Sequence, residues 1–216
     1  CLLCGGFTLS RERVCSYCEN QLLQRKSQKL KNYSVVSGLK VRRVWEWNST
    51  NDNLLRRLVY SLKNGRAPRA LYKWLAIQMV GSCLPGSFKQ QQNIVVVPSP
   101  PGRLGQKDHA FYLAEAVSEL LDCKLRPCLV RHFLEVEQKH LGREKRLTRQ
   151  MNFIGDDRRR RGSWVIFVDD IVTTGGTAVA AQKSLKNPEK FEVWTLATRS
   201  FLRVSSDTAI THHAVF

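Results

Sequence analysis

One stretch, residues 164–185, restricts the possible folds of this chain more than any other. An apolar, largely β-branched run over residues 164–168 ends at two adjacent acids, Asp169 and Asp170, and predicts a buried parallel strand. A turn of threonine and glycine follows, and residues 178–185 predict a helix. In an open α/β sheet this turn lies at the carboxyl end of its strand, where such sheets bind ligands.

The residue types in this turn suit a sugar phosphate. Consecutive backbone N–H groups and three hydroxyls at a helix N-terminus can hold a phosphate dianion. They belong to Thr173, Thr174, Gly175, Gly176 and Thr177. The carboxylates of Asp169 and Asp170 can accept hydrogen bonds from a vicinal diol, such as the 2′- and 3′-hydroxyls of a ribose. The simpler alternative is a strand-to-helix connection whose threonines cap the helix and whose acids favour its positive end.

Other segments predict further strands and helices of an α/β domain. Residues 35–47 predict a hairpin with Ser37 and Gly38 in its turn, and residues 94–97 predict a second buried strand. Prolines directly after that strand predict a rigid loop at its carboxyl end. Helices are expected over residues 53–62, 70–80 and 110–121, and a last strand over residues 191–198.

Four of the seven cysteines lie in two C-x-x-C pairs near the start of the chain, Cys1 with Cys4 and Cys15 with Cys18. Two such pairs can complete a tetrahedral site of four thiolates, which predicts one structural zinc ion with no open coordination position. Redox-active pairs are the rival interpretation, but no thioredoxin-like βαβ pattern surrounds them.

The composition indicates a polyanionic partner. Lysine and arginine number 35 against 18 acidic residues, a net charge of +17. Such an excess suits phosphorylated ligands, nucleic acid or both. No apolar run reaches the ~20 residues of a membrane span and no signal peptide is recognisable, so a cytoplasmic protein with reduced cysteines is expected.

The motif V-I-F-V-D-D-I-V-T-T-G-G-T at residues 165–177 resembles the phosphoribosyl pyrophosphate (PRPP) signature of type I phosphoribosyltransferases. The wider chain resembles the ComF family of competence-related, amidophosphoribosyltransferase-like proteins. The resemblance implies a type I phosphoribosyltransferase-like parallel sheet with helices on both faces, over residues 32–216. It also implies a small four-cysteine zinc finger with a linker over residues 1–31.

The resemblance also implies roles for individual residues. Asp169 and Asp170 are the expected catalytic and ribose-binding acids, Ser99 and Arg103 the expected pyrophosphate donors, and Mg²⁺ the expected companion of PRPP. The family usually continues R-G-F-[ND]-[QH]-A after the pyrophosphate loop, whereas this chain keeps only the Asp-His-Ala end at residues 108–110. His109 is also a candidate catalytic residue, but because it opens the helix expected over residues 110–121, a surface or capping role is favoured.

Two further segments fit the family pattern in part. Lys63 lies in a turn similar to the family's lysine-containing turn, although a charged helix end before a glycine explains it equally well. Residues 135–149 resemble the mobile hood over the active site and carry Gln138, Leu141 and Arg146 at the family's spacing, while Asn152 comes three residues late.

Two functions follow from these expectations. One is an enzyme that binds PRPP and transfers its ribosyl phosphate to an unknown acceptor. The other is a non-enzymatic factor that handles single-stranded DNA, together with competence-machinery proteins, during natural transformation. A PRPP-sensing transcriptional regulator is a weaker third candidate because no helix-turn-helix is recognisable.

Overall fold

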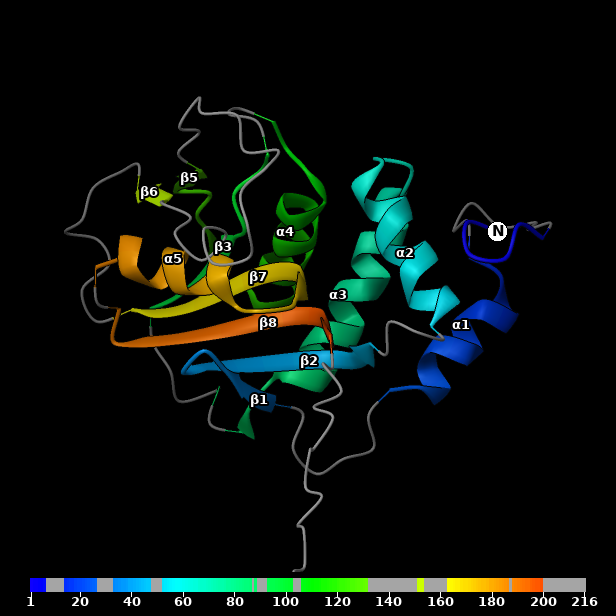
Figure 1. The fold of residues 1–216 in the computed structure, drawn as a ribbon, viewed down its shortest axis with the longest axis horizontal. Coiled ribbons are helices and arrows are strands. Elements are labelled where there is room, and N and C mark those ends of the chain that lie inside the picture. The colour runs from blue at the N-terminus through cyan, green and yellow to red at the C-terminus, as the bar shows by residue number, and fades with distance from the viewer. Residues whose placement is uncertain are drawn as a thin grey trace, which may run out of the picture.

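The computed structural model describes ten ranges of the chain: residues 1–6, 14–26, 33–47, 52–86, 88, 93–102, 106–131, 151–153, 163–186 and 188–199, the range 151–153 by its backbone alone. Five helices and eight strands lie in these ranges (Figure 1). The helices are α1 (Ser16–Gln24), α2 (Asn53–Lys63), α3 (Arg69–Cys83), α4 (His109–Leu121) and α5 (Gly176–Ser184). The strands are β1 (Tyr33–Val36), β2 (Leu39–Trp47), β3 (Ile94–Pro98), β4 (Lys124–Leu125), β5 (Leu129–Arg131), β6 (Met151–Phe153), β7 (Trp164–Val172) and β8 (Lys190–Arg199).

A six-stranded sheet forms the centre of the molecule, in the order β1-β2-β8-β7-β3-β4. Only β1 runs antiparallel to its neighbour; β2, β8, β7, β3 and β4 are parallel. A separate antiparallel pair joins β5 and β6. Because β7 lies between β3 and β8, the strand that ends in the acid pair is buried on both edges, as predicted.

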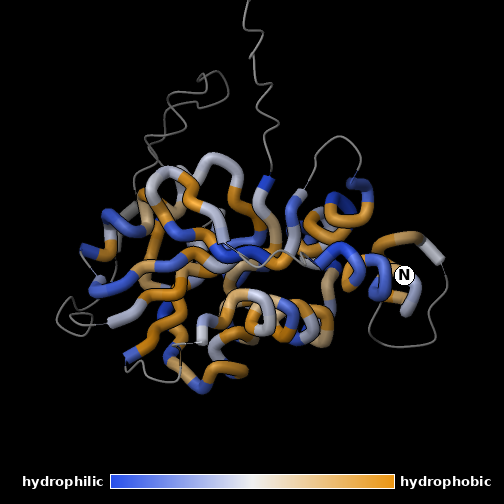
Figure 2. The backbone as a smooth tube through the Cα atoms, turned by 90° about the horizontal axis from the view of Figure 1, so that it is seen from below, coloured by the Kyte–Doolittle hydropathy of each residue, from blue (hydrophilic) through white to orange (hydrophobic). Residues whose placement is uncertain are grey.

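Two apolar layers hold helices against the two faces of the sheet. Along β7, Trp164, Ile166 and Val168 belong to the core shared with α2, α3 and α4. Val165 and Phe167 belong to the core shared with α5. This alternation is the period of a strand that is buried on both faces, and hydrophobic and hydrophilic residues alternate along the covering helices (Figure 2). The predicted fold class, a mostly parallel α/β sheet with helices on both faces, is confirmed.

The element bounds differ from the expected ones around the acid pair. β7 continues through both acids to Val172, and α5 begins at Gly176 instead of residue 178. The alternation breaks near Asp170, because Ile171 packs on the α3 and α4 side and Val172 on the α5 side. The Thr195 hydroxyl of β8 lies 2.9 Å from the Asp170 carbonyl oxygen at this irregularity. Pairing with β8 therefore continues the strand through the two acids to Ile171 and Val172, which are apolar and contribute to the two cores.

The predicted hairpin is confirmed, with Val36 opposite Leu39 and only Ser37 and Gly38 between them. Both turn residues have positive φ, +50° and +79°, which is the geometry of a type I′ hairpin turn.

The four-cysteine segment packs against the helical side of the sheet. Leu3, Cys18 and Leu22 belong to the same apolar core as α2 and α3. The Trp45 indole N–H of β2 donates to the Leu22 carbonyl at 2.9 Å. No helix within the described ranges has the length and apolar character needed to cross a bilayer.

Candidate functional site

The carboxyl ends of β3 and β7 lie side by side and carry the predicted polar residues. Pro98 pairs with Val168, and the Ser99 backbone N–H donates to the Val168 carbonyl at 2.8 Å. Ser99 and Asp169 are the next residues after this pair, so they lie at neighbouring positions, directly after β3 and on β7. Because parallel strands end on the same side of the sheet, both side chains are at the edge where α/β proteins bind ligands.

Asp170 is a buried acid at this edge and lies beside a lysine and a histidine side chain. Its Oδ2 atom lies 3.2 Å from the Lys63 Nζ atom and 3.4 Å from the His109 Nε2 atom, and 7% of its side chain is exposed. Lys63 is the last residue of α2 and His109 is the first residue of α4. Three segments that are far apart in the sequence thus converge on one carboxylate.

The two adjacent acids have opposite pKa shifts. Burial alone would raise the pKa of Asp170, but the His109 imidazole and the Lys63 ammonium outweigh burial and lower that pKa. Burial and the Asp170 charge raise the pKa of Asp169 well above its usual value. The Asp169 Oδ1 atom accepts a 3.0 Å hydrogen bond from the Asp170 backbone N–H. Two adjacent carboxyl groups of one strand therefore differ in acidity, and Asp170 is the stronger acid of the pair.

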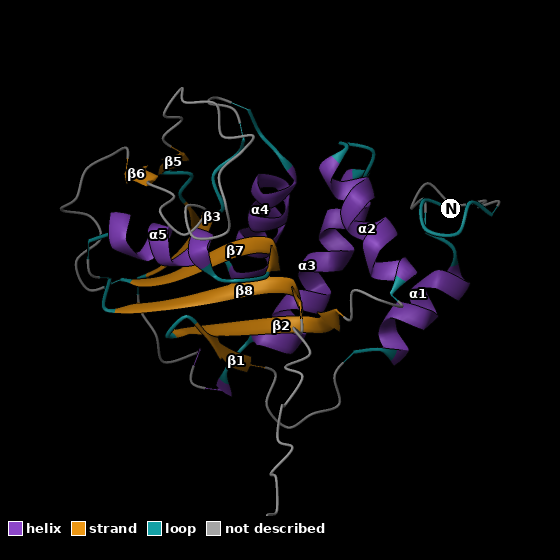
Figure 3. Cartoon of the chain, in the orientation of Figure 1, coloured by secondary structure: helices purple, strands orange, loops and turns teal. Residues whose placement is uncertain are grey.

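The loop between β7 and α5 presents a helix N-terminus directly after the acid pair (Figure 3). Gly175 is the N-cap of α5 and has a φ of +77°, a conformation that glycine adopts without steric cost. Thr173 and Thr174 are exposed, and Thr177 is half-buried in the first turn of the helix. The first N–H groups of a helix have no partner within the helix, so this turn can donate to an anion.

Two buried oxygens at the site lack a directed hydrogen bond. Among the described residues, neither the Ser99 Oγ atom nor the Asp170 Oδ2 atom has such a partner, and the contacts of Asp170 with Lys63 and His109 are ion-pair distances only. Buried polar atoms are rarely left without hydrogen bonds unless a functional role requires it. The site thus offers a carboxylate oxygen and a hydroxyl to an incoming polar ligand.

The structure describes the positions of most, but not all, of the predicted site residues. The structure brings together Asp169, Asp170, Ser99 and the loop 173–177, and their contacts with a ligand stay predictions. Arg103 and the hood segment 135–149 lie outside the described residues, and only the backbone of Asn152 is described.

The sequence favoured a structural role for His109 over a role in the site. This histidine was expected at the surface or as a cap, but Asp108 caps α4 and the His109 side chain is directed at Asp170. The available signal was its place at the start of the helix that follows the proline-rich loop. A side chain at that place lies at the ligand-binding edge of the sheet.

The four cysteines near the start form a cluster that fits a metal ion. The Sγ atoms of Cys1, Cys4, Cys15 and Cys18 all lie within 4.8 Å of one another. Cys4 and Cys15 have their sulfurs 3.7 Å apart, close to the roughly 3.8 Å that a tetrahedron with Zn–S bonds of about 2.3 Å requires.

Backbone N–H groups support the thiolate character of the cluster. Leu3 N and Cys15 N each lie 3.4 Å from the Cys1 Sγ atom, and Gly6 N lies 3.4 Å from the Cys4 Sγ atom. Such donors stabilise negative sulfur and orient metal ligands. The donor set therefore fits zinc.

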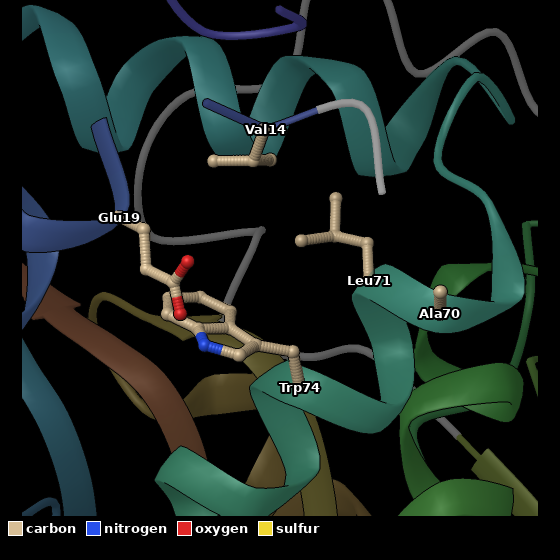
Figure 4. A pocket seen from close by; sticks show the side chains of 5 residues that line it. All are labelled: Val14, Glu19, Ala70, Leu71 and Trp74. Carbon is tan, nitrogen blue, oxygen red and sulfur yellow. The ribbon is translucent and has the colours of Figure 1, made fainter. Parts of the chain in front are cut away.

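A cavity of about 110 Å³ lies beside this cluster, away from the acid pair (Figure 4). Its lining is mainly apolar, with one carboxylate above an indole ring. The residues are Val14, Glu19, Ala70, Leu71 and Trp74. None of the predicted site residues lines it, so it plays no part in the site described above.

Comparison with known proteins gives likenesses to solved structures only. No family model matches the chain, and no curated protein matches it. The chain is 13% identical to the allosteric regulatory enzyme of purine biosynthesis (TM-score 0.38), covering 59% of this chain and 25% of that one. It is 15% identical to a hypoxanthine phosphoribosyltransferase of Trypanosoma cruzi (TM-score 0.39), covering 60% and 64%.

A third likeness covers more of both chains. An orotate phosphoribosyltransferase from Aeropyrum pernix is 15% identical, with a TM-score of 0.36, over 82% of this chain and 92% of that one. The chain thus spans only a quarter of the first of these proteins and just under two thirds of the second. At these TM-scores the likenesses do not establish an activity.

Proposed function

We propose that this protein binds PRPP, or a related ribose 5-phosphate, at the carboxyl ends of β3 and β7 as a phosphoribosyltransferase-like protein. One observation carries the proposal: Asp170, a buried carboxylate whose pKa is lowered by the neighbouring His109 and Lys63, is followed within five residues by the glycine-capped start of α5. An acceptor of diol hydrogen bonds thus lies next to a donor of phosphate hydrogen bonds.

Each part of the site suits one part of the ligand. The Asp170 Oδ2 atom accepts from a ribose hydroxyl, and the loop 173–177 donates to the 5′-phosphate. Transfer of the ribosyl phosphate breaks the bond between C1 and pyrophosphate through a cationic sugar, which a nearby ionised carboxylate stabilises. Mg²⁺ that arrives with PRPP supplies charge neutralisation of the leaving pyrophosphate. Ser99, and Arg103 beyond the described residues, are the proposed pyrophosphate donors.

Calorimetric titration with PRPP, ribose 5-phosphate and unphosphorylated ribose tests the proposal. The two phosphorylated ligands should bind, and ribose should bind far more weakly. Asp170→Asn should weaken both phosphorylated ligands by about 1.5–3 kcal/mol, the range for a hydrogen bond to a charged group. Asp122→Asn removes an exposed carboxylate at the end of α4 and should bind like wild type. Wild-type affinity in Asp170→Asn would remove the basis of the proposal.

We further propose that the protein is a ComF-like factor of natural competence and DNA uptake. The four-cysteine cluster and the net charge of +17 support this extension. Catalytic turnover of PRPP distinguishes an enzyme from a non-enzymatic factor. Pyrophosphate release from PRPP in the presence of a nucleobase panel indicates an enzyme, whereas binding of PRPP without release favours a non-enzymatic single-stranded DNA factor.

A further inference from the structure

The turn of the β1–β2 hairpin lies against the loop that follows β7. The Ser37 hydroxyl donates a 2.7 Å hydrogen bond to the Thr174 carbonyl, across 137 positions of sequence. A Cβ atom built on Gly175 would lie 3.1 Å from the Val36 Cγ1 atom and 3.4 Å from the Ser37 Oγ atom. The hairpin therefore covers one side of the loop at the two residues directly before α5.

Ser37 occupies an unfavourable backbone conformation at this contact. Its φ of +50° is in the left-handed region, which asparagine, aspartate and glycine adopt more readily than serine does in type I′ turns. Serine is thus a poor choice for the turn by itself. A non-glycine residue held in a sparsely populated region is a reason to look for a role of its side chain, and here the side chain is the hydrogen-bond donor.

The hydrogen bond fixes the orientation of one peptide group in the loop. In a trans peptide the carbonyl and the following N–H point in opposite directions. Because Ser37 draws the Thr174 carbonyl toward the hairpin, the Gly175 N–H is turned away from it. Thr173 and Thr174, the loop residues just before it, are exposed, whereas Gly175 itself is buried.

We propose that Ser37 is a positioning residue that holds the Thr174–Gly175 peptide with its N–H toward a bound phosphate. The edge hairpin is then part of the phosphate site although no residue of it needs to touch the ligand. This inference rests on the proposed function and deepens it, because it names a residue outside the 165–177 motif that sets phosphate affinity.

Two substitutions separate positioning from stability. Ser37→Gly removes the hydroxyl and also relieves the positive φ, so its Tm should equal or exceed that of wild type. Its affinity for ribose 5-phosphate should nevertheless fall about fivefold, the effect of one lost hydrogen bond of ordinary strength. Ser37→Ala should show the same loss of affinity with the strained turn kept. Ser34→Ala in β1, the strand that leads into the turn, is the matched control and should bind like wild type.

The amide resonance of Gly175 gives a direct readout. Titration of wild type with inorganic phosphate should shift this resonance, and the shift at equal phosphate concentration should be smaller in Ser37→Gly. If wild type binds ribose 5-phosphate and Ser37→Gly binds it equally well with an unchanged Gly175 shift, the positioning role is wrong while the proposed function stands. If wild type binds neither ribose 5-phosphate nor PRPP, the proposed function is wrong and this inference fails with it.

Discussion

Asp170 illustrates how neighbouring residues of one strand can acquire different chemistry. Asp169 and Asp170 are identical side chains in adjacent positions, yet Lys63 and His109 contact only Asp170 within the described residues. The contact lowers the pKa of Asp170, and the resulting charge raises the pKa of Asp169. Environments that separate two carboxyl pKa values in this way are typical of sites in which one acid acts as an anion and the other as a proton carrier.

Removal of the Lys63 charge should destabilise the protein at neutral pH. Lys63→Met removes the ammonium group beside the Asp170 carboxylate, and because Lys63 is half-exposed the expected loss is about 0.5–1 kcal/mol. Since the folded-state pKa of Asp170 is depressed, this stabilisation is present above the unfolded value of 3.8 and is lost as the pH falls below it. Thermal unfolding of Lys63→Met and of the charge-preserving Lys63→Arg at pH 7 and at about pH 2 measures both effects. An equal Tm of Lys63→Met and Lys63→Arg at pH 7 would contradict the ion pair.

Asp169→Asn should have the opposite effect on stability. The folded-state pKa of Asp169 is raised, so its contribution to stability is full below the unfolded value of 3.8 and is lost as the pH rises through the folded value. Asparagine does not titrate, and its advantage should therefore grow as the pH rises from 4 toward 8. A series of Tm measurements over this range checks the trend. A Tm below wild type at every pH would show that Asp169 is ionised in the folded protein without penalty.

At the scale of elements, the loop before α5 depends on a glycine for two separate reasons. Gly175 has a φ of +77°, and a Cβ atom there would approach Val36 to 3.1 Å. Gly38 has nearly the same φ, +79°, but a Cβ atom there meets nothing within 4 Å. Substitutions at the two glycines therefore distinguish the free-energy cost of a side chain in the left-handed conformation from the cost of its contact with Val36.

Alanine at both positions tests this difference. Gly175→Ala and Gly38→Ala should each lose about 1 kcal/mol from the left-handed backbone. Gly175→Ala should lose further stability from the contact with Val36, and its affinity for ribose 5-phosphate should fall more than tenfold. Gly38→Ala should keep its affinity. Equal unfolding free energies and equal affinities of the two variants would show that the hairpin does not restrict the loop.

The four-cysteine segment is expected to hold one zinc ion that also supports the neighbouring helices. Chelation, or Cys4→Ser, should remove about one equivalent of zinc and lower the Tm by roughly 10 °C, because α1 shares its apolar core with α2 and α3. Cys4 is exposed, so its replacement removes little packing. Cys123→Ser, outside the cluster, should retain the metal. Metal-free protein with an unchanged Tm would contradict a structural role of the site.

At the scale of the whole molecule, the net charge of +17 should make any nucleic-acid complex strongly dependent on salt. The logarithm of the binding constant for single-stranded DNA should fall with the logarithm of salt concentration by roughly 0.7 per neutralised phosphate. Replacement of the four arginines at residues 158–161 with serine should reduce this slope. These residues lie outside the described part of the structure, so the prediction rests on sequence alone. A complex whose affinity does not change with salt would restrict the role of the charge to small phosphorylated ligands.

The sequence by itself determined the hairpin of β1 and β2, the strands β3, β7 and β8, the succession of acids, threonines and glycines after the apolar part of β7, and the two C-x-x-C pairs near the start. It could do so because these features are local: apolar periodicity marks a strand, glycine and threonine mark the turn, and C-x-x-C spacing brings two sulfurs together. Even here the end of β7 was placed too early. Its pairing with β8 continues past the two acids to Val172, which lies opposite Thr198.

The tertiary structure alone decided which residues surround the acid pair. Lys63, His109 and Ser37 reach the 165–177 motif from α2, α4 and the β1–β2 turn, and no spacing in the sequence relates residue 37, 63 or 109 to residue 170. Their convergence follows from the strand order β1-β2-β8-β7-β3-β4 and from the packing of helices on the sheet. The difference in pKa between Asp169 and Asp170 could not be predicted from the sequence either. A pKa depends on burial and on charges within a few ångströms, which only the folded chain brings together.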